Sequence, residues 1–92
     1  MLSTITSLKH RIVDIIEPDF GLLDELLRLE VLSSREYDDV RSERRAAYRR
    51  SEAVLDLITS EHQCDKLLKA LQRTHQPHVV NFIVQNGGQK LN

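Results

Sequence analysis

Apolar residues recur along most of the chain at the three- and four-residue spacing of an amphipathic helix. The first stripe predicts a helix that ends before Pro18, because proline disfavours helical backbone at Glu17 and cannot donate its own amide. A second run holds five leucines in eight residues, which predicts the most deeply buried helix, with Asp19 as its cap. The two stripes consist of Ile5, Leu8, Ile12, Ile15 and Ile16, and of Leu22, Leu23, Leu26, Leu27 and Leu29.

The next segment carries a local signal for a helix start. Ser33 and Glu36 have the spacing of a capping box, and the short helix that they begin is predicted to bury Tyr37 and Val40. A loop is expected over residues 42–46, and the sequence leaves open where the following helix begins. That helix is predicted to bury Ser51, Val54, Leu55 and Ile58 and to expose Arg49, Glu52 and Asp56.

Two further helices complete the pattern. Ser60 and Gln63 form a second predicted capping box, and Pro77 is suited to the first position of a last helix. Gly87 and Gly88 are expected to end that helix, so we expect one domain over residues 1–86 and a frayed tail over 87–92. The residues predicted to be buried in these two helices are Cys64, Leu67, Leu68, Leu71, Val79, Val80 and Ile83.

These elements predict an all-α protein of six helices. The connections between them are short, which favours antiparallel neighbours in a single bundle. Only three glycines and two prolines are present, which leaves little room for the turns of an all-β fold. A chain of 92 residues is expected to bury about 60–65% of its unfolded surface. Its radius of gyration should be roughly 12 Å.

The composition narrows the class of partner. Thirteen Lys and Arg against fourteen Asp and Glu give a net charge of −1, whereas nucleic-acid binding usually needs a basic excess. One cysteine allows no internal disulfide and is typical of a reducing compartment. No apolar run approaches the roughly 18 residues of a membrane span. We therefore expect a cytoplasmic protein with no nucleic-acid or membrane partner.

Charge is distributed unevenly along the chain. Residues 14–39 contain nine acids and two arginines, a net charge of −7, whereas residues 41–50 contain five arginines and one glutamate, a net charge of +4. Two patches of opposite sign on one small helical body indicate a protein-binding module. The arginine cluster alone leaves two other interpretations open: an ordinary solvated helix face, or a small helical module that binds nucleic acid.

Candidate catalytic and metal-binding residues are few. His62 and Cys64 are two apart on a predicted helix and point in different directions, and His75 with His78 has no fourth ligand nearby in the sequence. Cys64 lies on an apolar stripe, which indicates a packed and unreactive thiol. We find neither a phosphate-binding loop nor a Ser/His/Asp arrangement. The sequence therefore predicts no enzyme, no metal and no cofactor.

Two segments carry a resemblance to a known family. They read LLDELLRLEVLSSREYDDVRSE, residues 22–43, and QCDKLLKALQRTHQPHVVNFI, residues 63–83. Together they resemble a caspase recruitment domain, and the likeness extends over about residues 8–83. It is greatest to the domains of inflammasome sensors and their adaptor, and smaller to those of initiator caspases. The segment RSERRAAYRR departs from the family, whose members often have a polar loop with proline there.

The resemblance implies a six-helix antiparallel Greek-key bundle of the death-fold superfamily and a mode of association. Such domains dock a basic face of the first and fourth helices onto an acidic face of the second and third helices of the next molecule. The chain would then bind itself or another such domain head-to-tail and nucleate a filament that recruits a caspase. The prodomain of an initiator caspase is the alternative within the family. The implied basic face is Lys9, Arg11, Arg45 and Arg49; the implied acidic face is Asp24, Glu25, Glu36, Asp38 and Asp39.

Overall fold

The computed structural model describes residues 1–43 and 47–88 of the chain. Within this part the backbone forms six helices and no strand, as the sequence predicts. The Cα radius of gyration is 12.3 Å, close to the expected value. The helices are α1 (Leu2–Ile12), α2 (Leu22–Arg28), α3 (Ser34–Arg41), α4 (Ala47–Asp56), α5 (Glu61–Arg73) and α6 (Pro77–Gly88).

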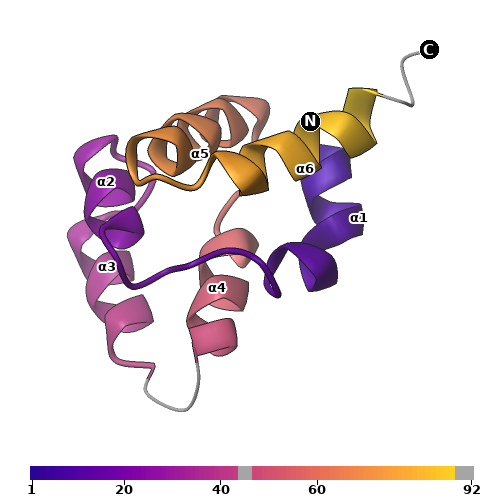
Figure 1. Cartoon of the computed structure of the whole chain (residues 1–92). Helices are drawn as coiled ribbons and strands as arrows, with labels where there is room; N and C mark the ends of the chain where they lie inside the picture. Colours follow the sequence, from indigo (N-terminus) through magenta and orange to yellow (C-terminus); the bar gives the residue numbers. More distant parts are fainter. Residues whose placement is uncertain (44–46, 89–92) are drawn as a thin grey trace.

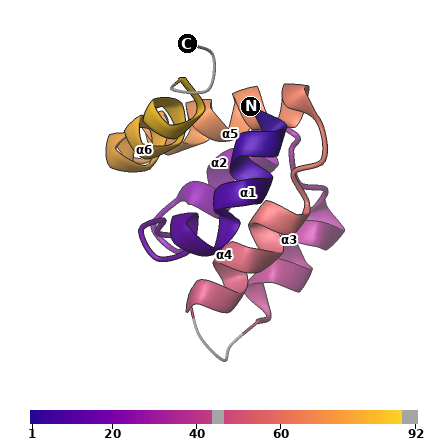
Figure 2. The same cartoon turned by 90° about the vertical axis from the view of Figure 1, so that its right-hand side faces the viewer.

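The bundle is organised around α5. This helix packs against α1, α2 and α6, while α3 joins α2 to α4 and α4 packs against α1. In Figure 1, α1 lies on one side of the molecule and α2 and α3 on the other, with α4 and α5 between them. The view from the side, in which α2 and α3 lie behind α1, shows the same separation (Figure 2). Surfaces on α1 and on α2–α3 therefore face different neighbours.

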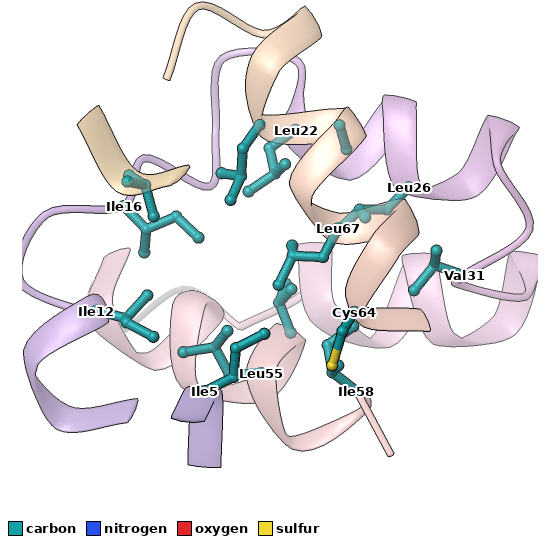
Figure 3. Close-up of a cluster of buried hydrophobic side chains, with 14 of the residues drawn as sticks. Ile5, Ile12, Ile16, Leu22, Leu26, Val31, Leu55, Ile58, Cys64 and Leu67 are labelled. Carbon is teal, nitrogen blue, oxygen red and sulfur yellow. The ribbon is translucent and has the colours of Figure 1, made fainter. Parts of the chain in front are cut away.

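The core is built from the predicted apolar stripes. Leu22 and Leu26 of α2, Leu67 of α5 and Cys64 of α5 are all fully buried. Figure 3 shows Leu26 and Leu67 close together, with Ile5 and Ile12 entering the same cluster from α1. Full burial of one such aliphatic side chain contributes about 1.5–3 kcal/mol. The leucine-rich helix, predicted to be the most deeply buried, thus contributes Leu22, Leu23 and Leu26 to the central core.

The first helix is shorter than predicted. It ends at Ile12, and a turn continues the chain, with the Ile16 amide still donating to the Ile12 carbonyl at 2.9 Å. Ile15, expected on the buried face, is 37% exposed, because the turn rotates it out of the stripe. Pro18 has no amide to donate to the preceding turn, so the helix cannot continue through it, and the Ile15 carbonyl is instead contacted by the His78 ring of α6 at 3.0 Å.

The start of α2 also differs from the prediction. Asp19 does not cap the helix; its carboxylate instead accepts hydrogen bonds from Arg50 on α4. The cap position belongs to Gly21, whose φ of +96° lies in the left-handed region that favours glycine. The helix ends at Arg28, so Leu29 follows it, and Glu30 adopts a left-handed conformation with φ of 63°. A long-range ion pair thus overrides the local capping signal.

The later helix starts agree more closely with the sequence. Ser33 and Glu36 form the complete capping box. Ser60 accepts from the Gln63 amide at 3.1 Å, but the Gln63 side chain accepts from the Thr59 amide at 2.7 Å, so the second box is only half formed.

The bounds of α4 and α6 can also be compared with the sequence. The α4 helix begins at Ala47, while residues 44–46 of the expected loop lie outside the described residues. Pro77 is the first residue of α6, as predicted, and this helix runs to Gly88. Residues 89–92 of the expected tail lie outside the described part.

Candidate interaction surface

The acidic residues of α2 are partly engaged within the molecule. The Asp24 carboxylate accepts a hydrogen bond from the Tyr37 hydroxyl of α3, and the Arg41 guanidinium lies over the Tyr37 ring. This bond favours the protonated phenol, so it raises the pKa of Tyr37; partial burial acts in the same direction. Asp24 is nevertheless exposed, and its carboxylate remains at the surface where α2 meets α3.

Glu25 is less accessible than its place in the implied acidic face requires. Its side chain is only 13% exposed, because two arginines cover it. Arg28 donates from Nε at 2.5 Å, and Arg73 of α5 approaches to 3.7 Å. Glu25 thus contributes to a charge cluster within the molecule and presents little carboxylate surface to a partner.

The acids of α3 divide into two groups. Glu36 accepts from the Ser33 amide at 2.8 Å and is tied to the capping box. Asp38 and Asp39 are exposed and project from the same short helix. The structure therefore leaves Asp24, Asp38 and Asp39 as the most accessible carboxylates among the predicted acidic residues.

The two predicted basic residues of α1, Lys9 and Arg11, contact different helices. Lys9 forms an ion pair with Asp56 at the end of α4. Arg11 lies over the Phe82 ring of α6, with its guanidinium carbon 5.0 Å from the ring centroid. The structure thus brings Lys9 next to α4 and places Arg11 against α6.

On α4, Arg49 is exposed and pairs with Glu52 at 3.5 Å. Its guanidinium also lies over the Tyr48 ring, 5.2 Å from the centroid. Arg45, the remaining predicted basic residue, lies outside the described residues. Lys9 and Arg49 are therefore the described members of the predicted set that lie on the α1–α4 side.

Sequence reasoning missed a second ionic cluster. Arg50 donates to both Asp19 oxygens at 2.7 Å and from Nη1 to the Glu43 carbonyl at 2.7 Å. The hydrogen bonds to Asp19 raise the pKa of the Arg50 guanidinium. Arg50 therefore joins the α1–α2 connection, the end of α3 and the body of α4. No local spacing could have indicated this contact, since its partners are 31 and 7 residues away.

A polar recess of about 370 Å³ lies beside this cluster. Asp19, Asp24, Tyr37, Arg41 and Arg50 line it. Its acids and arginines are already paired with one another or with Tyr37. These contacts connect neighbouring helices, so we assign the lining residues a structural role.

The candidate metal and nucleophile residues lie apart from these faces. Cys64 is fully buried, and burial, followed by the nearby Glu61 charge, raises the pKa of its thiol. Among the described residues, no three His, Cys, Asp or Glu side chains are grouped so that they could hold a metal ion. Nor does the described part contain a helix long and apolar enough to cross a membrane.

The arrangement of six helices agrees with a comparison of the chain with protein families. The family model described as caspase recruitment domain matches residues 2–86. No curated protein and no solved structure matches the chain.

Proposed function

The chain belongs to the caspase recruitment domain family, and from this premise we propose that it associates head-to-tail with copies of itself or with a related domain. The family supports the coarser function, a module that interacts with other such domains. The proposal adds the surfaces: Lys9, Arg11, Arg45 and Arg49 on one molecule, and Asp24, Glu25, Glu36, Asp38 and Asp39 on the next.

The observation that carries the proposal is the separation of opposite charges. Lys9 belongs to α1 and Arg49 to α4, whereas Asp24, Asp38 and Asp39 belong to α2 and α3. The α1 helix lies on the side of the molecule opposite α2 and α3, with α4 between them (Figure 1). A contact between two different surfaces is heterologous, and such contacts form open helical assemblies unless a rotation closes them. Growth into a filament is therefore the expected form of self-association.

The contacts of the arginines favour a protein partner over nucleic acid. Of the five arginines in residues 41–50, Arg50 is bound to Asp19 and Glu43, and Arg41 lies against Tyr37. Only Arg49 among the described three is both exposed and directed away from these clusters. A phosphate backbone would need several free cations along one surface.

The biological role that follows is recruitment in the cytoplasm. A protein bearing this domain would nucleate a filament and concentrate a caspase or an adaptor with a matching domain, in inflammasome or apoptotic signalling. Each contact would be weak, and repetition along the filament would make assembly cooperative. Association should be rapid and sensitive to salt, because rim charges act mainly on the encounter of the partners.

Electron microscopy of the purified domain after a step down in salt tests this proposal. Filaments should appear at low salt and shorten or disappear when salt is restored. A domain that stays monomeric at every salt concentration, by light scattering and microscopy, would contradict self-association. Titration with duplex DNA or RNA at physiological salt should show no binding.

A further inference from the structure

The surface that carries Lys9 and Arg49 also carries two acids. On α4, Arg49, Glu52 and Asp56 follow one another at spacings of three and four residues, so they lie along one side of the helix. Glu52 pairs with Arg49 at 3.5 Å, and Asp56 pairs with Lys9 from α1. Each described cation on the α1–α4 side is therefore neutralised by an acid of its own molecule.

Helix stability does not account for Asp56, and it accounts for Glu52 only through its pair with Arg49. Asp56 is the last residue of α4, where the negative end of the helix dipole disfavours a carboxylate. Glu52 is four residues before it, and like charges at that spacing repel each other. One oxygen of Glu52 is covered and has no hydrogen-bond partner among the described residues, so its charge depends on Arg49 nearby.

Both cations remain accessible to a competing carboxylate. The side chain of Lys9 is 32% exposed and that of Arg49 is 46% exposed, while Asp56 is largely in solvent. Ion pairs of this kind hold weakly and exchange readily. An acid from another molecule can therefore reach either cation, but Glu52 or Asp56 weakens its attraction, because each internal carboxylate cancels part of the positive charge beside it.

We infer that Glu52 and Asp56 are internal competitors that hold Arg49 and Lys9 in the free domain and set the concentration at which it assembles. The inference rests on the proposed function, because it requires an acidic face on the partner. The acids keep the free domain dispersed at low concentration. At the end of a growing filament the local concentration of the partner's carboxylates is high, so they bind Arg49 and Lys9 in spite of the internal acids.

The test compares Asp56→Asn, Glu52→Gln and the double variant with the parent. Each change removes one charge and keeps the shape of the side chain. Light scattering across a dilution series gives the lowest concentration at which each protein assembles. Each single variant should assemble at a concentration about twofold to fivefold lower than the parent, the range expected for one exposed ion pair. The double variant should assemble at a lower concentration still.

Asp65→Asn is the matched control. Asp65 is exposed on α5, and its removal changes the net charge by the same amount as Asp56→Asn. It should leave the assembly concentration as in the parent, which separates local competition from a general effect of net charge. The difference between Asp56→Asn and the parent should also shrink at high salt, where exposed pairs are screened.

Three outcomes would overturn the inference. If the double variant assembles at the same concentration as the parent, the two acids do not compete for the cations. If it needs a higher concentration, the acids themselves contact the partner. If Arg49→Glu also assembles as well as the parent, the proposed function is wrong as well, so the two failures can be told apart.

Discussion

Gln76 forms two hydrogen bonds with the backbone of Glu17, 59 residues earlier in the chain. Its side-chain oxygen accepts from the Glu17 amide at 2.7 Å, and its side-chain nitrogen donates to the Glu17 carbonyl at 2.8 Å. Gln76 is only 4% exposed, so it lies inside the protein just before α6. One amide side chain thus satisfies a donor and an acceptor of the connection between α1 and α2, where no helix supplies a partner.

Replacement of Gln76 should therefore lower the free energy of unfolding, although Gln76 is polar and not part of the apolar core. Gln76→Ala leaves both backbone groups of Glu17 without their partner, and we expect unfolding to become easier by about 2–4 kcal/mol. Gln72→Ala, at an exposed position of α5, should change stability by less than about 0.5 kcal/mol. Urea unfolding of both variants measures the difference. Equal midpoints would show that water replaces the Gln76 bonds without loss.

Leu26 is fully buried at the centre of α2. Leu26→Ala should destabilise the domain by about 2–5 kcal/mol, because it removes buried methyl groups and leaves a cavity. Phe20→Ala is the control, since Phe20 is 79% exposed and should cost less than about 0.5 kcal/mol despite its larger side chain. Chemical unfolding of the pair decides whether α2 is central. A small shift for Leu26→Ala would contradict its role in the core.

Cys64 should react with a thiol reagent only as fast as the domain opens. The thiol is buried and its pKa is raised, so the native state presents very little reactive thiolate. Labelling followed by mass spectrometry should therefore slow with every stabilising condition and accelerate in mild denaturant. Cys64→Ala should still assemble. Rapid labelling in the native state would place the thiol at the surface.

Tyr37 should titrate above its ordinary pKa of 10.0, because its hydroxyl donates to Asp24. A raised pKa in the folded state means that the bond stabilises the protein below the unfolded pKa. That contribution is lost as the pH rises through the folded value. The parent should therefore lose stability at alkaline pH more steeply than Tyr37→Phe, which lacks the titrating group. Unfolding midpoints of the two proteins across this range test the sign, and parallel curves would contradict it.

Reversal of charge on either face should abolish self-association without unfolding the domain. Arg49→Glu and Asp38→Arg change exposed side chains, so each should leave the unfolding free energy within about 0.5 kcal/mol of the parent. Asp38 is a cleaner choice than Asp24, because Asp24→Arg would also break the bond to Tyr37. Each variant alone should remain monomeric, as like charges would meet across every contact.

A mixture of Arg49→Glu and Asp38→Arg is the discriminating measurement. Each variant keeps one intact face, and the two reversed residues meet with opposite charges restored. The mixture should regain assembly at low salt, measured by co-sedimentation. If both single variants polymerise as well as the parent, the charged faces are ordinary solvated surface.

Local signals in the sequence predicted local features of the fold well. The Ser33–Glu36 box and Pro77 at the start of α6 depend on neighbouring residues, and both were correct. The cap of α2 was wrong because a distant residue decides it, and the end of α1 lies earlier than predicted. Arg50 takes Asp19 away from the cap position, and His78 contacts the Ile15 carbonyl. Spacing along the chain carries no information on such contacts.

The same limit applies to the interaction surface. The sequence predicts the sign of each face, because charges cluster along the chain. It does not show that Arg73 covers Glu25 or that Asp56 holds Lys9, since each pair forms only when separate helices pack. The Arg49–Glu52 pair, three residues apart on one helix, could have been predicted from spacing alone.

The hydrogen bond from Arg50 to the Glu43 carbonyl has a consequence for protein engineering. It ties Glu43, just after α3, to the first half of α4 at 2.7 Å, and Asp19 accepts from the same guanidinium. The approach of α4 to the end of α3 is therefore supported by a side chain and by direct packing of the two helices, in addition to the linker. An insertion between Glu43 and Ala47 would cost mainly loop-closure entropy, about 0.6 kcal/mol for each doubling of length. This position is thus a natural place to graft a reporter peptide or an affinity tag without disturbing the bundle.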